Sequence, residues 1–397
     1  MDKQVYQTAI LGAGASGLFA AGLLKGRTII IEGNKKPGLK ILVSGGGACN
    51  FGNRAVSGAD YFGQNPRFCL SALAGFGADS FAALLRQNKI PFTAREDGKL
   101  FARSSADILD FLLSRIEGEF TFNNHIKKVN KSGNIFEIIT DKNIFHAKNV
   151  ICALGGLSCP ALGAGGAAYD IAKDFGLALT PRYPALTGII FDKKMKETFA
   201  PLAGISCAAK LKNGKNIFAG GILFTHSGLS GPAVLQASLY GIKNKEISID
   251  FLPGFDVSAM LAAAKTSPQK PSALLRGKLP ARLLQVLIGQ NDKQLANLNK
   301  KEIAQIAAAF NNFTFTVKEI YGYDKAEITA GGVDTKGISS QTMQAVDTPG
   351  LYFTGEALDI SGRLGGYNLH WAWASAEAAA RAINTSPRHC ERSEAIY

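Results

Sequence analysis

The fold is decided by the stretch QTAILGAGASGLFAAGLL, which spans residues 7–24. An apolar segment, residues 7–11, predicts a buried strand, and a glycine-rich turn and the start of a helix follow it. The turn has the spacing GxGxxG. Gly12 permits the tight turn, Gly14 lets a pyrophosphate approach the backbone, and Gly17 lets the helix pack against the strand. We therefore predict an α/β fold with a Rossmann-type dinucleotide-binding core.

The next apolar strand, residues 28–31, ends at Glu32, about twenty residues past Gly12. At this distance a carboxylate accepts hydrogen bonds from ribose hydroxyls and repels a 2′-phosphate. The nucleotide bound here is therefore predicted to be FAD or NAD. These residues alone do not choose between the two.

Further glycine-rich loops accompany apolar segments later in the chain. SGGGACN occupies residues 44–50, a strand predicted at 150–154 enters a Gly-Gly pair, and a strand predicted at 351–354 enters GEALD, residues 355–359. Such loops border the ligand in Rossmann sheets. FAD is long enough to require both ends of a chain, whereas NAD rarely does, so this distribution favours FAD.

The segment GRLGGYN, residues 362–368, opens a helix that contains Trp371 and Trp373 and then becomes alanine-rich. The positive end of its dipole is expected to face the pyrimidine side of a reduced flavin, which carries negative charge. The two tryptophans are interpreted as helix packing.

Composition indicates a globular protein of two or three domains, because 397 residues include 46% hydrophobic and 19% charged residues. The formal charge is +13, and most of the surplus of Lys and Arg lies between about residues 185 and 325. A solvated lysine surface explains this surplus, and an anionic substrate, NADPH or an RNA partner are the alternatives.

The cysteines and the uncharged N-terminal stretch indicate where the protein works. Six cysteines without a CxxC pair predict neither a metal site nor a disulfide framework, and they favour a reducing compartment. No charged residue occurs between Gln4 and Leu24, but polar residues and glycines interrupt this stretch, which argues against a signal peptide or a membrane span. We expect a cytoplasmic protein without a membrane partner.

The texture of the sequence changes between about Ala185 and Lys325. Short alternating runs predict strands of a small barrel, at residues 188–191, 208–211, 246–251 and 313–317, and periodic runs predict helices at 259–264, 280–288 and 301–310. We predict four parts: an FAD-binding Rossmann core over residues 1–184, an inserted β-barrel-like and helical domain over 185–325, the second part of the core over 326–386, and a mobile tail over 387–397. A cleft between core and insert is the expected substrate site.

Six motifs together resemble the aminoacetone oxidase family of bacterial flavoproteins, also known as NAD(P)/FAD-dependent oxidoreductases: SGGGACN, ALGGLSCP, FTHSGLSGP, ITAGGV, LYFTGEALD and GGYNLHWAWAS. The resemblance spans about residues 5–384. It implies a two-part FAD-binding Rossmann domain with an inserted barrel-like and helical region. Two positions depart from the family pattern, since Ala48 stands where an Arg is usual and Ala167 where an acid is usual, which puts in doubt a role for the missing guanidinium.

The resemblance implies FAD contacts that are distributed over both ends of the chain. They are Gly12, Gly14, Ser16, Gly17, Glu32, Lys40, Ser44, Gly45, Gly46, Asn50, Gly155, Gly355, Glu356, Asp359, Gly366 and Tyr367. Neighbours on the same turns complete the predicted set: Ala15, Gly33, Ala153, Gly156, Gly365 and Asn368.

Flavin itself carries the hydride, so the protein has to supply only orientation, exclusion of water and one proton donor or acceptor. His226, in a polar glycine turn, and His370, directly after the flavin motif, are the candidates for proton transfer. The alternative for His226 is a backbone hydrogen bond, and the alternative for His370 is a surface position. Cys49 is interpreted as a packed thiol, because no resolving cysteine is near it in the sequence.

The leading hypothesis is an FAD-dependent oxidoreductase that transfers a hydride between a small organic substrate and flavin, with NAD(P)H or oxygen as the electron partner. No second GxGxxG is present, so a separate nicotinamide domain is not expected. A flavoprotein that binds or modifies RNA or tRNA through its basic insert is the alternative. A flavin-bearing interaction protein without turnover is a third hypothesis.

Overall fold

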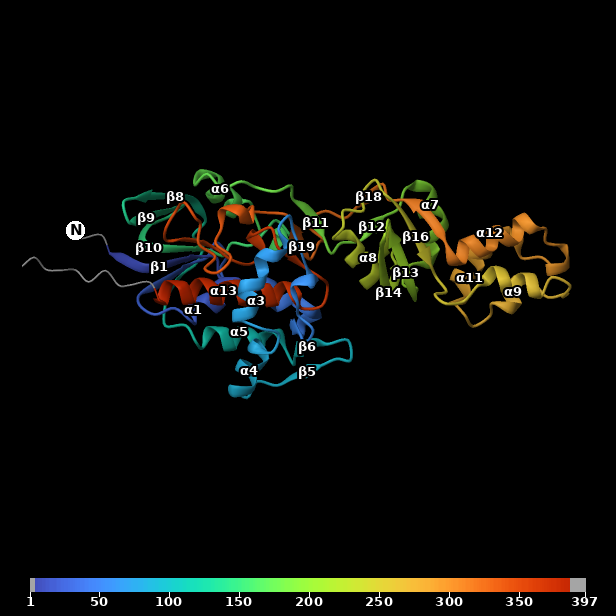
Figure 1. Ribbon diagram of the computed structural model, residues 1–397, viewed down its shortest axis with the longest axis horizontal. Coiled ribbons are helices and arrows are strands. Elements are labelled where there is room, and N and C mark those ends of the chain that lie inside the picture. Colours follow the sequence, from blue (N-terminus) through green and yellow to red (C-terminus); the bar gives the residue numbers. More distant parts are fainter. Residues whose placement is uncertain (1–3, 386–397) are drawn as a thin grey trace, which may run out of the picture. The chain divides into compact units, whose positions relative to one another are not determined.

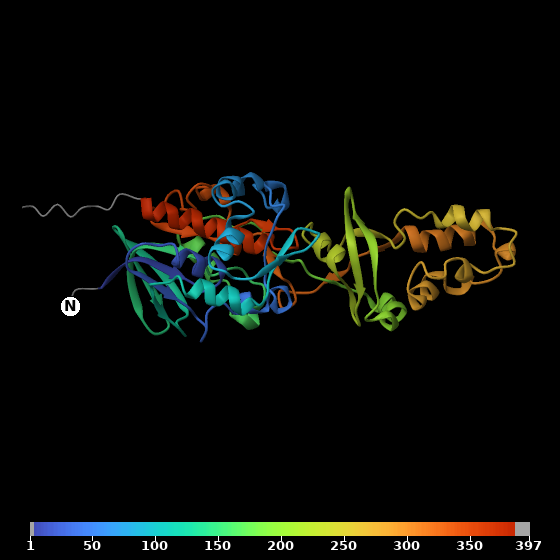
Figure 2. The same ribbon diagram turned by 90° about the horizontal axis from the view of Figure 1, so that it is seen from below.

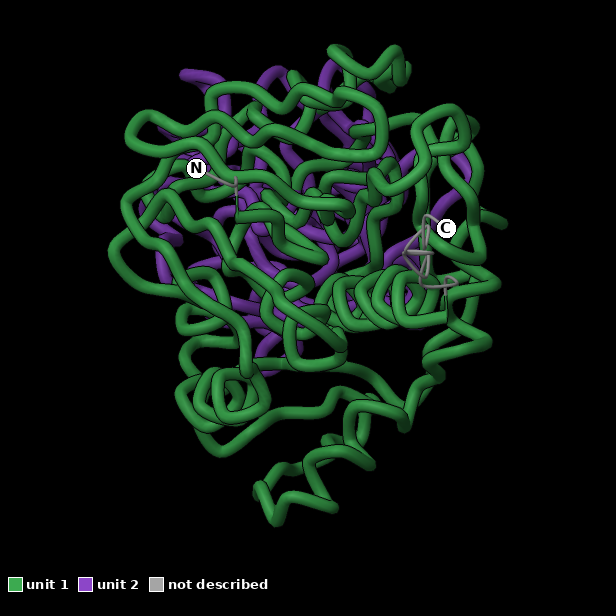
Figure 3. Tube along the Cα trace, turned by 90° about the vertical axis from the view of Figure 1, so that its left-hand side faces the viewer, with its two compact units in different colours: residues 1–182, 329–397 green, residues 183–328 purple. Residues whose placement is uncertain are grey.

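The computed structural model describes residues 4–385, and the predicted tail with His389 and Cys390 lies outside them (Figure 1). The chain divides into two compact units (Figure 3). Unit 1 comprises residues 1–182 and 329–397, and unit 2 comprises residues 183–328. Each unit has its own cluster of buried apolar side chains, so each has the core of a separate domain.

Unit 1 is built on a seven-stranded sheet in the order β7-β2-β1-β10-β9-β8, with β20 also paired to β10. The four pairs β7–β2, β2–β1, β1–β10 and β10–β20 are parallel, and β9 pairs antiparallel with both β10 and β8. The strands are β1 (Val5–Leu11), β2 (Thr28–Ile31), β7 (Glu119–Thr121), β8 (Ile126–Ser132), β9 (Ile135–Thr140), β10 (Ile144–Cys152) and β20 (Leu351–Phe353).

Strand β10 joins the two ends of the chain. Along one side it pairs with β1. Along the other side its first half pairs with β9, while residues 150–152 pair with β20. The segment after residue 350 is thereby held in the same parallel sheet as the N-terminal strand.

Three smaller sheets are present among the described residues. One contains β3 (Asn50–Asn53), β6 (Lys99–Ala102) and β5 (Phe92–Ala94). The other two are the pairs β4 (Tyr61–Phe62) with β21 (Ser361–Gly362) and β11 (Tyr183–Ala185) with β19 (Ile328–Ala330).

The longest helix of unit 1, α13 (Tyr367–Thr385), packs beside α1 (Ala15–Ala21), as Figures 1 and 2 show. Aromatic rings from both ends of the chain fill this contact: the Trp373 ring stacks on Phe81 at 4.5 Å between centroids and meets Phe19 edge-on at 5.5 Å. The other helices of unit 1 are α2 (Leu39–Val43), α3 (Leu70–Gly75), α4 (Ser80–Gln87), α5 (Ser105–Leu113) and α6 (Ala167–Asp174).

Unit 2 contains an antiparallel seven-stranded sheet in the order β17-β16-β13-β14-β15-β12-β18. Its strands are β12 (Ile189–Ile190), β13 (Ser206–Asn213), β14 (Asn216–Phe224), β15 (Gly228–Ser230), β16 (Glu246–Asp250), β17 (Phe313–Thr316) and β18 (Glu319–Ile320). Among the described residues, β17 and β18 are the two edge strands of this sheet. The helices are α7 (Lys193–Phe199), α8 (Pro232–Ser238), α9 (Val257–Ala263), α10 (Pro271–Leu274), α11 (Ala281–Ile288) and α12 (Lys300–Asn311).

One segment, Pro66–Gln87, is long and apolar enough to cross a membrane by length and composition alone. In the structure it includes the two short helices α3 and α4, and Phe68, Ala72, Phe81 and Leu85 from it are buried in the core of unit 1. Core helices of soluble proteins pass the same test, so the absence of a membrane partner stays a prediction.

Candidate cofactor site

The turn between β1 and α1 has the geometry that its glycines require. Gly12 has φ +99°, in the left-handed region, and a Cβ there would lie 2.7 Å from the carbonyl oxygen of Ala153. A Cβ on Gly17 would collide with the carbonyl of Gly12. Both positions therefore exclude larger residues for reasons of packing within the protein. This packing brings the turn against Ala153, which directly follows β10.

Glu32 lies at the end of β2, where its side chain reaches back to the glycine turn. One carboxylate oxygen accepts a hydrogen bond from the amide of Ala13 at 2.7 Å, and the other accepts from the amide of Asn34 at 2.8 Å. Glu32 is largely buried. The oxygen that accepts from the Asn34 amide also accepts from the Asn34 side-chain nitrogen at 2.8 Å. The other oxygen keeps a second lone pair, with which the fixed carboxylate can still accept a hydroxyl donor of a ribose.

Open space borders three of the predicted contact glycines. A Cβ on Gly14, Gly46 or Gly155 would meet no protein atom within 4 Å. These positions contrast with Gly12 and Gly17, where the protein itself fills the space. A backbone without side chains beside open space is what the close approach of a dinucleotide requires, so these residues fit FAD.

Lys40 on α2 and Glu356, which follows β20, form an ion pair at 2.7 Å. Ser158 joins them, because its hydroxyl lies 2.6 Å from the Lys40 ammonium and 2.7 Å from the second Glu356 oxygen. That same oxygen accepts the Thr329 amide at 2.8 Å. A Cβ on Gly156 would lie within 2.7 Å of this carboxylate. Four separate chain segments therefore meet in one polar cluster.

Burial of Glu356 acts to raise the pKa of its carboxyl, but other contacts outweigh it. The charge and hydrogen bond of Lys40, with the hydrogen bonds from Ser158 and Thr329, lower the pKa of Glu356 below its ordinary value. Glu356 is therefore a fixed anion at neutral pH, and it holds the Lys40 ammonium in place.

Gly355 links the C-terminal motif to the N-terminal turn. A Cβ on Gly355 would lie 2.9 Å from the Ser16 hydroxyl, so the two loops are in direct contact. The Gly355 amide donates to the Ser375 hydroxyl, and its carbonyl accepts from the Trp371 indole at 3.0 Å. Trp371 therefore holds the loop at Gly355 in position through this hydrogen bond, in addition to its packing.

A second loop contact surrounds the start of α13. The Asn50 side chain accepts from the amide of Gly366 at 3.1 Å in the amide orientation that satisfies its neighbours. Asn368 accepts from the amide of Gly362 at 2.8 Å and returns a bond to its carbonyl. Asp359 accepts from the amide of Gln64, and burial raises its pKa. These three polar side chains hold loops in position.

The remaining predicted cofactor contacts lie at or next to the ends of helices and strands of unit 1. Ala15 and Ser16 open α1, Gly33 follows β2, Ser44 and Gly45 lie in a 3₁₀ turn after α2, and Gly365 and Tyr367 adjoin the start of α13. Tyr367 is buried, and its ring meets Tyr61 edge-on. All predicted cofactor residues therefore belong to unit 1.

His370 requires a correction. Its ring is fully buried, with Nε2 3.1 Å from the carbonyl oxygen of Phe76. Burial lowers the pKa of His370 to about 4. The ring is therefore neither the exposed surface residue nor the substrate-accessible proton donor that the sequence suggests, because α13 turns this face toward Phe76 in the core.

His226 and Cys49, the other two residues considered for chemistry, differ in their exposure to solvent. His226 is exposed in the turn between β14 and β15, a turn closed by the Thr225 hydroxyl, and it belongs to unit 2. Its role in proton transfer stays a prediction. Cys49 is buried, and burial raises the pKa of its thiol to about 11, as expected for a packed thiol.

Comparison with known proteins identifies the family to which the chain belongs. The family model described as the HI0933-like protein Rossmann domain matches residues 6–382. The chain belongs to the HI0933-like family. The chain therefore contains a Rossmann domain, and the predicted Rossmann-type α/β fold class is confirmed.

Two curated relatives of this HI0933-like protein cover nearly the whole chain. The ribosomal RNA dihydrouridine synthase of Escherichia coli is 39% identical over 95% of this chain and 97% of its own length. The 3-dehydro-bile acid delta(4,6)-reductase of Clostridium scindens is 32% identical over 95% of this chain and 99% of its own length. Among solved structures, the quinol fumarate reductase FrdA of E. coli aligns with 98% of this chain and 72% of its own, at 14% identity and a TM-score of 0.50. That likeness concerns the fold.

Two members of the polar cluster were not predicted as site residues. Ser158 and Thr329 contact Glu356, although they lie 198 and 27 positions from it in the chain. The only local signal is that each lies within a glycine-containing motif, ALGGLSCP for Ser158 and ITAGGV for Thr329.

Proposed function

We propose that this protein is an FAD-dependent reductase that converts uridine in ribosomal RNA to dihydrouridine. The observation that carries the proposal is the 39% identity with a ribosomal RNA dihydrouridine synthase over almost the full length of both chains. The open space beside Gly14, Gly46 and Gly155 in unit 1 and the formal charge of +13 support it. A cytoplasmic location is part of the same proposal.

The names of the two relatives describe related chemistry. Dihydrouridine differs from uridine by two hydrogens added across the C5=C6 bond, and a delta(4,6)-reductase adds hydrogens to carbon–carbon double bonds of its own substrate. Bound FAD, once reduced, supplies the hydride in such reactions. A proton is needed at the second carbon.

A reduced nicotinamide is the electron donor in this proposal. The overall reaction then balances, because NAD(P)H, one proton and uridine give NAD(P)⁺ and dihydrouridine. No dedicated nicotinamide domain is expected from the sequence, so the nicotinamide would bind transiently.

The Lys40 cluster provides the fixed charges of the site. Its ammonium is held by Glu356 at 2.7 Å and Ser158 at 2.6 Å, and the Lys40 side chain is 39% exposed. A partly exposed ammonium in a fixed position can stabilise negative charge on the cofactor or on a substrate carbonyl. We assign Lys40 this role and assign Glu356 and Ser158 the role of positioning it.

A small-molecule substrate is the second candidate, and the bile acid reductase relative favours it. In that case a conjugated ketone takes the place of the uracil ring. Oxidation of aminoacetone, which the motif resemblance implies, belongs to the same class of small-molecule hypotheses.

The test is a reaction of the purified full-length protein with three substrates: an unmodified ribosomal RNA transcript, a 3-oxo-4,6-diene steroid and aminoacetone. NADH or NADPH is supplied with the first two, and oxygen with the third. Nucleosides from the digested RNA are measured by mass spectrometry. Dihydrouridine that depends on both FAD and a reduced nicotinamide supports the proposal.

The alternatives give distinct outcomes. Steroid reduction without dihydrouridine formation would favour the small-molecule reductase, and oxygen consumption with aminoacetone would favour the oxidase. A protein whose bound flavin is reduced by NAD(P)H but which leaves the RNA unchanged contradicts the proposed function.

A further inference from the structure

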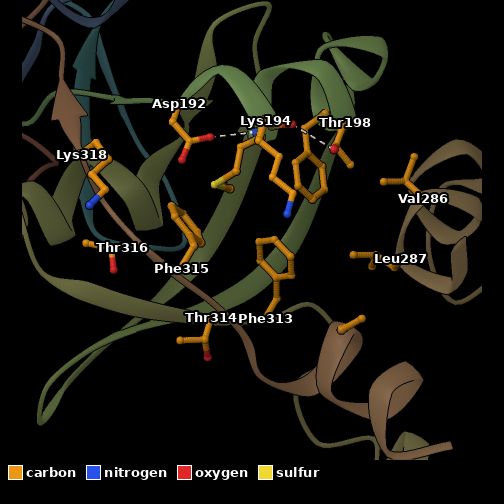
Figure 4. A pocket seen from close by; sticks show the side chains of 13 residues that line it. Asp192, Lys194, Thr198, Val286, Leu287, Phe313, Thr314, Phe315, Thr316 and Lys318 are labelled. Atoms are coloured by element: carbon orange, nitrogen blue, oxygen red, sulfur yellow. Dashed lines mark hydrogen bonds between the residues drawn. The ribbon is translucent and has the colours of Figure 1, made fainter. Parts of the chain in front are cut away.

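A groove with a volume of about 510 Å³ lies within unit 2 (Figure 4). This volume is in the ~300–1,000 Å³ range of ligand sites. Helix α7 forms one side and edge strand β17 another, while Val286, Leu287 and Ala309 from α11 and α12 complete the lining. The residues that line the groove all belong to unit 2, whereas the predicted cofactor residues belong to unit 1.

Phenylalanine rings line the groove. Phe313 and Phe315 alternate along β17 with exposed Thr314 and Thr316, and β17 pairs only with β16, so its other edge is unpaired within residues 4–385. Phe313 meets the buried Phe199 edge-on at 5.3 Å between centroids. Phe313 and Phe315 are only half-buried, and their rings are held by the core. Rigid aromatic surface of this kind can stack on a nucleobase.

Two lysines add positive charge to the groove. Lys194 and Lys318 both line it and are exposed. Over residues 4–385, no carboxylate lies within ion-pair distance of either lysine, whereas Lys293 in the same unit pairs with Glu302 at 2.7 Å. The acid in the lining, Asp192, accepts from the Met195 amide at 2.9 Å and so caps α7. The lining therefore carries two ammonium groups that are not ion-paired and one carboxylate, which gives it a net positive charge.

The surrounding unit has the same sign of charge. Residues 183–328 contain 18 Lys and Arg against 10 Asp and Glu, a net charge of +8 out of +13 for the chain. An apolar peptide in the groove would leave both ammonium groups without a counter-charge. A polyanion with aromatic bases satisfies the ammonium groups and the phenylalanine rings together.

We propose that this groove binds a single-stranded segment of RNA, with a base against Phe313 or Phe315 and phosphates at Lys194 and Lys318. This inference rests on the proposed function, since it names how unit 2 holds the RNA substrate. The residues that would hold RNA in the groove are different from the predicted cofactor residues.

The test uses the full-length protein and a fluorescein-labelled oligouridylate of twelve nucleotides, with binding followed by fluorescence anisotropy at several salt concentrations. Lys194→Glu with Lys318→Glu should weaken binding at least tenfold. The slope of log affinity against log salt should fall by about 0.7 for each lost phosphate contact. The matched control is Lys212→Glu with Lys215→Glu, which makes the same charge change at exposed positions of β13 and its hairpin turn.

Phe315→Leu separates stacking from charge. It should weaken binding roughly tenfold and leave the salt slope unchanged, because the side chain stays apolar but loses its ring. Should this variant fail to fold, the exposed lysine pair still decides the question. Binding by both groove variants that equals wild type, or no binding by wild type at low salt, would overturn the inference; the first result would leave the groove to an apolar protein partner.

The two proposals fail in different ways. If wild type forms dihydrouridine but the groove variants bind RNA normally, the groove inference is wrong and the function stands. If the groove variants lose RNA binding but wild type forms no dihydrouridine, the proposed reaction is wrong and the groove stands.

Discussion

The Lys40 ammonium lies 2.7 Å from a carboxylate oxygen of Glu356, although 316 positions separate the two residues in the chain. Lys40 is on α2 near the N-terminus, and Glu356 follows β20 near the C-terminus. The pair is possible because β20 adds to β10, which itself pairs with β1. One parallel sheet thus brings charges from both chain ends to the candidate cofactor site.

Replacing Lys40 should therefore cost stability. In Lys40→Met the partly buried Glu356 carboxylate loses its cation, and we expect unfolding free energy to fall by about 1–3 kcal/mol, between the values for exposed and buried pairs. Denaturant unfolding of the FAD-free protein measures this. Lys36→Met is the control, because Lys36 is exposed in the loop before α2. Adding Glu356→Gln to Lys40→Met should restore part of the loss; a further full loss would contradict the pairing.

The ionised state of Glu356 predicts a pH dependence. Because its folded pKa lies below the ordinary value of 4.5, its contribution to stability is present above that value and is lost as pH falls through the folded pKa. Unfolding of wild type and Glu356→Gln, measured at pH 7 and at stepwise lower pH below 4.5, should converge. Parallel curves with no convergence would show that Glu356 is not ionised in the folded protein.

Gly14 and Gly17 should respond in opposite ways to alanine. Gly14→Ala has room for its Cβ, so the FAD-free protein should keep its stability within about 0.5 kcal/mol but lose FAD affinity, since the methyl group would occupy the dinucleotide's approach. Gly17→Ala should destabilise even the FAD-free protein, because its Cβ collides with the Gly12 carbonyl. Thermal unfolding and bound-flavin absorbance measure the two effects. Full FAD occupancy in Gly14→Ala would argue against a pyrophosphate at this turn.

His370 should make the protein less stable in mild acid. Its folded pKa of about 4 lies below the ordinary 6.5, so the unfolded chain takes up a proton first as pH falls. The loss begins near pH 6.5, is complete near pH 4, and should reach about 3 kcal/mol. His370→Leu should lack this component, whereas His226→Gln, at an exposed turn, should retain it. A wild-type curve that is flat between pH 6.5 and 4 would contradict the burial of a neutral ring.

Local pattern was enough to predict the first strand, turn and helix, because residues 5–31 combine an apolar strand, GxGxxG and a second apolar strand. Strand β10 was predicted at 150–154 but begins at Ile144, since the polar residues of its first half conceal the strand where it pairs with β9. A partly exposed half of a strand contains few apolar residues, so its sequence gives little indication of a strand.

Tertiary contacts explain what the sequence could not predict. The Lys40–Glu356–Ser158 cluster depends on strand pairing across the whole chain, and no local spacing reports it. The burial of His370 depends on Phe76, nearly three hundred positions earlier. The partner of Lys40 is set by the pairing of the strands, and the partner of His370 is set by the packing of helix α13. The residue types indicated what chemistry each side chain could do, but they did not indicate which residues surround it.

In our proposal, both ends of the chain form one FAD site in unit 1. The measurement that tests it most directly is the visible absorbance of the purified protein after incubation with excess FAD and removal of unbound cofactor, with the released flavin identified chromatographically. We expect one FAD per chain in wild type. A folded protein that remains colourless after this treatment would contradict it.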